Sequence, residues 1–179
     1  MRCRKGFTII ELMIAMAIVG ILAVVSTTNM MSWLNHSSAV GFQREILARS
    51  NDARVRSMGS NRQHRIMIDM GNNVVRLQAG NAGTGSSVWT DIGMPIEGTR
   101  GAGIREIVND TSPPGTVSPP AIFSFIFNPG GQVMSQDNAA TIRPLGQARI
   151  RLTADNPADL AAIRLFGWTS KARLEDDAP

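Results

Sequence analysis

One acid, Glu11, lies inside an apolar run near the N-terminus, where a charged side chain is unusual. The run, residues 6–25, reads GFTIIELMIAMAIVGILAVV, and a basic leader, MRCRKG, overlaps its start. An acid at the centre of a bilayer costs about 2.5–3.5 kcal/mol, and intramembrane acids usually have a partner. No Lys or Arg lies between Lys5 and Arg44. The partner is therefore expected from the leader, from another chain or from a newly made amino terminus.

Residue types that carry catalysis are sparse elsewhere. The chain has 2 His and one cysteine, Cys3, and it contains no H-E-x-x-H or G-x-S-x-G pattern. Because a catalytic site needs grouped nucleophiles, bases or metal ligands, we expect no enzymatic activity, no metal site and no cofactor. His64 has no Cys or second His at a ligand spacing and is expected to be a surface residue at a strand start. The Gly-rich stretch 79–87, AGNAGTGSS, lacks the Lys and the following helix of a phosphate-binding loop.

Length and charge limit the class of protein. A chain of 179 residues suits one membrane or filament helix and one small globular domain. The formal net charge is +4 at pH 7, but three of the cations, Arg2, Arg4 and Lys5, belong to the leader. The rest of the chain is nearly neutral, so its charge gives little reason to expect a nucleic-acid partner.

The apolar run is long enough to cross a membrane. From Phe7 to Val25 it extends about 28 Å as a helix, at about 1.5 Å per residue, which is close to the hydrocarbon thickness. The positive leader is expected to stay in the cytoplasm and the C-terminal part to lie outside. A removed secretory signal is disfavoured because the only candidate cleavage site, near Ala23, is weak. A plain transmembrane anchor fits the run but does not explain Glu11.

Residues 6–12, GFTIIEL, resemble the class III signal of type IV prepilins and of type II secretion pseudopilins. The shared features are a basic leader, Gly6, Phe7 and an acid four positions after the Phe, all leading into an apolar run. The resemblance implies that a prepilin peptidase cuts between Gly6 and Phe7 on the cytoplasmic side and that Phe7 is then N-methylated. It also implies that Glu11 pairs with the Phe7 amine of a neighbouring subunit during assembly.

Beyond the run, the sequence predicts one long helix and then a β-rich domain. Ile46, Ser50 and Ala53 follow the i, i+4, i+7 spacing of a helix face, and the helical pattern continues to about Met58. The predicted class is α+β, with the pilin fold that the resemblance implies: a long N-terminal helix packed on a C-terminal antiparallel β-rich globular domain. The expected divisions are a cleaved leader (1–6), a transmembrane and filament-core helix (7–34), its amphipathic continuation (35–59) and a periplasmic β-rich domain (60–179).

Alternation of apolar and polar residues predicts the strands. They are expected at 64–70, 73–78, 121–127, 132–134, 148–153, 161–168 and 170–174. The strand at 121–127 is expected to be central, with Phe123, Phe125 and Phe127 on one face. Residues 92–107 look like short apolar pieces cut by glycines. The Pro-rich stretch 111–120, TSPPGTVSPP, is expected to have no regular structure.

Two short stretches resemble the GspH/FimT-like minor pilins and pseudopilins. Residues 127–131, FNPGG, are similar to their F-x-P-x-G turn, and residues 163–173, IRLFGWTSKAR, are similar to their final hairpin. A minor subunit also suits the single cysteine, because the C-terminal disulfide loop usual in major pilins is impossible here. The resemblance implies three kinds of partner: other pilins or pseudopilins through the N-terminal helix, the prepilin peptidase and the inner-membrane assembly platform.

We therefore expect a minor type IV pilin that helps to initiate or cap a pilus, or alternatively a GspH-type minor pseudopilin of a type II secretion system. Both systems share the signal and the fold. The expected location is the bacterial inner membrane, as a single-pass protein with a cytoplasmic N-terminus and a periplasmic domain, and then the filament.

DNA uptake is a third and less favoured possibility. Some FimT-type members bind DNA through Gly-Arg-x-Arg in the last hairpin, and the matching positions here are Ser170, Lys171, Ala172 and Arg173. Lys171 and Arg173 are therefore the candidate DNA contacts. The acids at 175–177 weaken this interpretation, since phosphate binding needs local cations.

Overall fold

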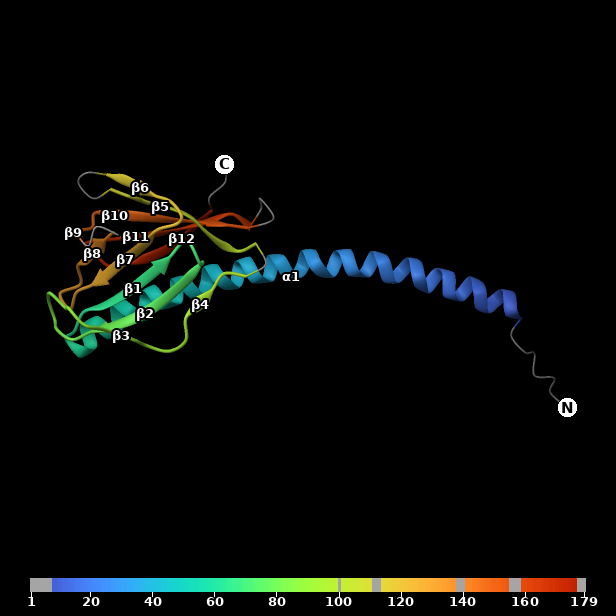
Figure 1. Ribbon diagram of the computed structural model, residues 1–179, viewed down its shortest axis with the longest axis horizontal. Coiled ribbons are helices and arrows are strands. Elements are labelled where there is room, and N and C mark those ends of the chain that lie inside the picture. Colours follow the sequence, from blue (N-terminus) through green and yellow to red (C-terminus); the bar gives the residue numbers. More distant parts are fainter. Residues whose placement is uncertain (1–7, 100, 111–113, 138–140, 155–158, 177–179) are drawn as a thin grey trace. The chain divides into compact units, whose positions relative to one another are not determined.

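The computed structural model describes residues 8–99, 101–110, 114–137, 141–154 and 159–176, and it divides into two compact units, residues 1–34 and 35–179. One helix, α1 (Ile9–Ser60), begins in the first unit and ends in the second (Figure 1). Asn61 follows it in the left-handed region, with φ 51°, the conformation that commonly ends a helix. The prediction of a single long helix is confirmed.

The second unit is rich in strands, which confirms the α+β class. The described residues form β1 (His64–Asp69), β2 (Val74–Gly80), β3 (Trp89–Asp91), β4 (Ile96–Glu97), β5 (Gly103–Asn109), β6 (Gly115–Val117), β7 (Ile122–Phe127), β8 (Val133–Gln136), β9 (Ile142–Pro144), β10 (Gln147–Thr153), β11 (Ala161–Phe166) and β12 (Ala172–Asp176). These strands pair antiparallel in two sheets.

The first sheet has the order β3-β2-β1-β7-β8-β9, with β4 paired to β2. The predicted hairpin of β1 and β2 is present, with Ile66 opposite Leu77 and the turn residue Asn73 at φ 53°. β7 lies between β1 and β8, as expected for the most apolar strand. Its alternation puts Phe123, Phe125 and Phe127 together in the core.

The second sheet has the order β12-β11-β10-β5-β6. Two of its strands differ from expectation. β5 is a full strand in the region expected to hold only short apolar pieces. Its alternation is interrupted because Arg151 pairs with Glu106 and Leu152 pairs with Ile104, which leaves Arg105 as an extra, bulged residue.

The expectation that residues 111–120 have no regular structure is wrong for three of them. Gly115–Val117 form β6, which pairs with β5 at the edge of the sheet. No Pro interrupts these three residues, and an edge strand satisfies its ladder on one side only. The flanking prolines therefore limit the length of β6 without preventing it.

One hydrophobic core joins the second half of α1 to both sheets. The helix contributes Ala39, Phe42, Ile46 and Ala53, which are buried together with the three phenylalanines of β7 and with apolar residues of β5, β10 and β11. Figure 1 shows this part of α1 running beneath the strands of the second unit. Small polar residues continue the helix face between the apolar ones. Ser50 donates to the carbonyl of Ile46 at 2.9 Å, so its buried hydroxyl is satisfied.

The helix is also tied to the loop before β11. The Nδ1 atom of His36 lies 2.6 Å from Oδ1 of Asp159, whose side chain is almost fully buried. Gln43, about two turns further along the helix, donates from Nε2 to the Asp159 carbonyl at 2.7 Å. These contacts hold both the side chain and the backbone of Asp159 against α1.

Gln63 closes the Gly-rich loop that follows β2. Its backbone amide donates to the Ala82 carbonyl, and its carbonyl accepts from the Gly80 amide, each at 2.8 Å. Its side-chain oxygen accepts from the Ser86 amide at 2.8 Å, and its Nε2 donates to Oδ1 of Asn128 at 2.7 Å. All four polar groups of one buried residue are thus used, and the loop is folded back on itself rather than open to a phosphate.

The expectation that His64 is a surface residue is wrong, since only 5% of it is exposed. It starts β1, where the pairing of β1 with β2 and β7 covers it from both sides. Burial lowers the pKa of His64 below its ordinary value of 6.5, partly opposed by contact of Nδ1 with the Arg62 carbonyl at 3.2 Å. The imidazole is therefore held in its neutral form.

This burial predicts that the protein loses stability as the pH falls from about 7 through 6.5 and below. The unfolded chain binds a proton at His64 more readily than the folded chain, so acid favours unfolding. Thermal unfolding between about pH 8 and 5 measures the effect, and His64→Gln should show a smaller decrease in Tm than the wild type. The carboxylate of Asp69 affects stability only at lower pH, because hydrogen bonds from Asn72 lower its pKa below 3.8. If Tm falls equally in the wild type and in His64→Gln between pH 7 and 5, His64 is not the source of the pH dependence.

Candidate functional site

The helix begins with a capping box built from Thr8 and Glu11. The backbone amide and the hydroxyl of Thr8 both donate to Oε2 of Glu11, each at 2.9 Å. The Glu11 amide lies 3.3 Å from the Thr8 hydroxyl oxygen, and the Leu12 amide donates to the Thr8 carbonyl at 3.3 Å. Donors at a helix start lack partners within the helix, and this reciprocal arrangement satisfies them.

The capping box gives Glu11 a partner, Thr8, that is not among the partners predicted from the sequence. Among the described residues, its carboxylate is bound by Thr8 and forms no ion pair with a cation. The sequence contains the pattern that predicts this contact, since T-x-x-E directly before an apolar run is typical of a capping box. Gly6 and Phe7, the predicted cleavage and methylation residues, lie outside the described residues, so their roles stay predictions.

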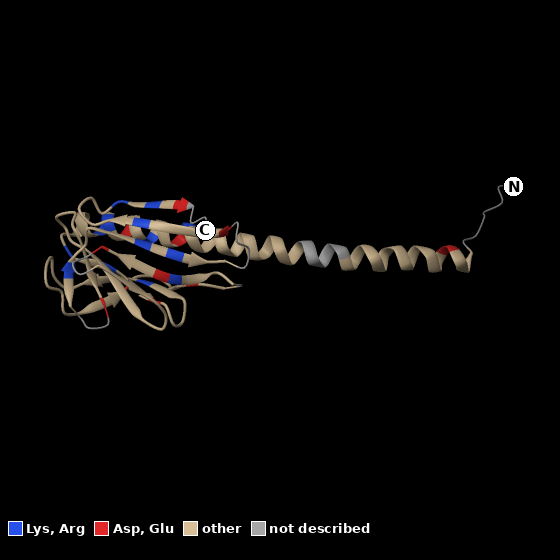
Figure 2. Cartoon of the chain, turned by 90° about the horizontal axis from the view of Figure 1, so that it is seen from above, with Lys and Arg blue, Asp and Glu red and all other residues tan. Residues whose placement is uncertain are grey.

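The first part of α1 is an apolar surface with one charge. Every described side chain from residue 9 to 24 is exposed, for example Ile9 at 80% and Met16 at 71%. Glu11 is the only Asp, Glu, Lys or Arg between Lys5 and Arg44, and Figure 2 shows no other Lys, Arg, Asp or Glu in the first part of the helix. An exposed apolar surface of this extent marks an interaction with protein or lipid.

Judged on length and hydropathy together, none of the helices in the described residues qualifies as a membrane-spanning segment.

The second predicted group, Lys171 and Arg173, lies on the last hairpin of the second unit. Lys171 is exposed in the β11–β12 turn, and Arg173 is exposed on β12 directly opposite Arg164 of β11. Glu175, one of the acids expected to oppose phosphate binding there, forms an ion pair with Arg164 at 2.9 Å. Glu11 belongs to the other unit.

The turn itself is held by Ser170. This residue has φ 47°, a conformation that favours glycine, and it occupies the position where the resembling hairpins have Gly. It is 2% exposed, and its hydroxyl oxygen accepts from Nε of Arg54 on α1 at 3.0 Å. The hairpin is therefore fastened to the helix by one buried side chain.

The turn at 127–131 has the expected form. Gly131, at φ 84°, donates from its amide to the Asn128 carbonyl at 2.9 Å, which closes a tight turn between β7 and β8. Next to it, Val133 donates to the Gly167 carbonyl at 2.7 Å, which joins this turn to the last hairpin. The two stretches that carry the subtype resemblance are thus neighbours in the fold.

Within the described part of the chain, no three His, Cys, Asp or Glu side chains come together as a possible metal site.

Comparison with known proteins gives one family model and one solved structure. Residues 1–27 match the prokaryotic N-terminal methylation motif. The minor pseudopilin EpsH from the type 2 secretion system of Vibrio cholerae is 12% identical, with a TM-score of 0.35 over 60% of this chain and 95% of that chain. No curated protein matches.

The motif match covers the residues that the sequence analysis singled out, from the basic leader through Gly6, Phe7 and Glu11 to the end of the apolar run. In the structure, the same segment leads into a long helix whose second half packs on an antiparallel β-rich unit. The chain therefore carries a prokaryotic N-terminal methylation motif at the start of a long helix, and a β-rich unit follows that helix.

Proposed function

We propose that this protein is a minor pilin that helps to initiate or cap a type IV pilus, entering the filament from the inner membrane through α1. The observation that carries the proposal is the single acid, Glu11, in the otherwise uncharged, exposed and apolar first part of α1, residues 9–24. A filament of such helices would bury this acid. Burial of a carboxylate is tolerated only with a charged or hydrogen-bonding partner, which a neighbouring Phe7 amine would provide.

The capping box suggests how Glu11 is accommodated before assembly. Thr8 donates two hydrogen bonds to one carboxylate oxygen, and hydrogen bonds reduce the cost of placing a polar group in an apolar phase. The exposed apolar surface of residues 9–24, behind a basic leader, favours insertion with the N-terminus in the cytoplasm and the β-rich unit in the periplasm.

Processing is the direct test of this proposal. Intact mass of protein extracted from cells with an active prepilin peptidase should correspond to a chain that begins at Phe7 and carries one N-methyl group. In cells that lack the peptidase, the mass should include residues 1–6. Retention of the leader in peptidase-positive cells would contradict the proposal. Gly6→Leu provides a second comparison, since a bulky residue at the cleavage position should leave the leader attached in both strains.

A GspH-type minor pseudopilin of a type II secretion system is the alternative. Both assignments share the motif, the helix and the β-rich unit, so they differ in partners. Crosslinking from residue 18, in the exposed part of α1, followed by mass spectrometry of the captured subunits separates them. Capture of pilus subunits supports the pilin, and capture of secretion-system pseudopilins supports the alternative.

DNA binding at Lys171 and Arg173 is a second candidate function. It is favoured by one observation: both side chains are exposed, while Glu175 is paired with Arg164. A gel shift with the full chain at low and high salt tests it, because phosphate contacts make DNA binding depend steeply on salt. No shift at low salt ends this candidate.

A further inference from the structure

Three arginines stand opposite one another on adjacent strands of the second sheet. Arg149 of β10 is in register with Arg164 of β11, which is in register with Arg173 of β12. The next residue pair, Ile150 and Ile163, is buried, so the arginines share the other, partly exposed face. Like charges directly opposite each other destabilise a sheet. The arrangement therefore needs compensation from nearby anions.

Carboxylates compensate only part of this row. Arg164 forms an ion pair with Glu175 at 2.9 Å. Arg151 lies two residues after Arg149 on β10, on the same face of the sheet, and forms an ion pair with Glu106 at 2.7 Å. Among the described residues, no carboxylate forms an ion pair with Arg149. Its neighbour in register on β5 is Val108, which is apolar. Arg149 is thus a cation placed between a cation and a hydrophobic side chain.

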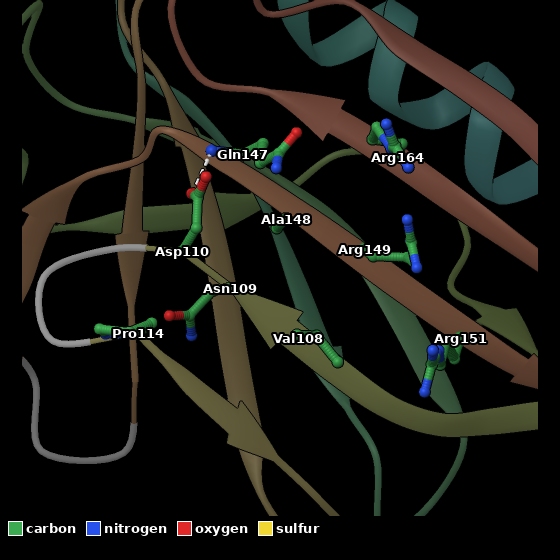
Figure 3. Close-up of a pocket in the computed structure, with 9 residues that line it drawn as sticks. All are labelled: Val108, Asn109, Asp110, Pro114, Gln147, Ala148, Arg149, Arg151 and Arg164. Carbon is green, nitrogen blue, oxygen red and sulfur yellow. Dashed lines mark hydrogen bonds between the residues drawn. The ribbon is translucent and has the colours of Figure 1, made fainter.

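A cavity of about 310 Å³ opens at this point. Figure 3 shows Arg149 between Arg151 and Arg164 along one part of its lining. Val108, Ala148 and Pro114 add apolar surface. Among the described residues of the lining, Asp110 is the one acid, and it lies at the other end in Figure 3, where its carboxylate accepts from the Gln147 backbone amide. The cavity therefore has a cationic end and an apolar wall.

We propose that this cavity binds a small phosphate monoester, with Arg149 as the principal contact. A phosphate monoester carries about −1.5 to −2 charges and three acceptor oxygens near neutral pH. Planar guanidinium groups donate pairs of hydrogen bonds to such oxygens. The cavity is at the lower end of the range for small-molecule sites, about 300–1,000 Å³, so it suits a compact organic group rather than a polymer.

The two ion pairs make the cavity selective for phosphate over carboxylate. Glu106 and Glu175 already occupy one donor group each on Arg151 and Arg164. A singly charged carboxylate would gain mainly Arg149. A phosphate with three oxygens also uses the remaining donors of Arg164, so an additional oxygen adds a contact that the carboxylate lacks.

Titration calorimetry of the full chain in a nonionic detergent tests the proposal, with phenyl phosphate as the probe and benzoate as the matched carboxylate. We expect one phenyl phosphate per chain and at least about tenfold weaker binding of benzoate. Arg149→Gln should weaken phenyl phosphate binding by at least about tenfold. Arg105→Gln is the control, since Arg105 is on the same sheet, is exposed and does not line the cavity.

Several results would overturn the proposal. These are no binding of phenyl phosphate up to about 10 mM, equal losses in Arg149→Gln and Arg105→Gln, or equal affinity for benzoate. Binding of a single-stranded oligonucleotide without binding of phenyl phosphate would show a polyanion surface instead. Arg149→Gln should unfold at the same temperature as the wild type or higher, because it removes a like-charge contact. If it misfolds, Arg149→Lys, which keeps the charge but not the fork, should still bind more weakly.

Discussion

Glu11→Gln should enter the membrane normally but reach filaments at no more than about a hundredth of the wild-type level. Gln at this position can still accept from Thr8, because Glu and Gln both complete a capping box. The substitution therefore keeps the start of α1 and removes only the charge. In a filament core it would leave the Phe7 amine of a neighbour without a counter-ion, and breaking a buried ion pair costs about 3–5 kcal/mol.

The matched variants separate charge from capping. Thr8→Val loses the hydroxyl that bonds Oε2 of Glu11 but keeps the carboxylate, so it should enter filaments in reduced yet measurable amounts. Glu45→Gln, an exposed acid on the second half of α1, should behave as the wild type. Sheared filaments and membranes are compared by quantitative immunoblot. If Glu11→Gln assembles as well as Glu45→Gln, the carboxylate serves only the helix start, and ion pairing between subunits is wrong.

Gly167→Ala should destabilise the β-rich unit by about 3 kcal/mol, the upper end of the range for overpacking. A Cβ at this position would lie 1.6 Å from the Leu145 carbonyl oxygen, which is backbone and cannot rotate away. Relief would require movement of β11 or of the Leu145–Gly146 segment. Either movement breaks the bond from the Gly167 amide to the Gly146 carbonyl, now 2.8 Å long.

Thermal unfolding followed by circular dichroism measures this effect, and for a unit of this size Tm should fall by about 10 °C. Gly130→Ala is the control from the nearby turn, since a Cβ there meets nothing within 4 Å and its φ is not positive. It should change Tm by less than about 2 °C. A Gly167→Ala protein as stable as Gly130→Ala would mean that the backbone around Leu145 yields easily.

The long helix and the most apolar strands could be predicted from sequence because their patterns are local. The period of β1 and the three phenylalanines of β7 follow directly from alternation. β5 was not predicted because its bulge at Arg105 breaks that alternation. Ile104 and Ile107 are both buried although they are three positions apart, which is an odd spacing for one face of a strand. A bulge depends on the partner strand, which a single segment does not reveal.

The candidate sites divide in the same way. Glu11 can be identified from the sequence because it is a single acid in an apolar run. Its capping partner Thr8 could have been predicted from the T-x-x-E pattern. The arginine row could not, because Arg149, Arg164 and Arg173 become neighbours only through the register of three strands. The burial of His64 was missed for a similar reason, since strands on both sides of β1 cover it.

The closure of the Gly-rich loop by Gln63 also limits how the chain can vary. A glycine-rich surface loop is ordinarily a place where residues can be inserted or deleted freely. Here the Ala82 carbonyl and the Ser86 amide must both reach the same residue, so the number of residues between them is set by the span of one glutamine. The loop should therefore keep a constant length among related proteins that retain this glutamine, even where its residues change.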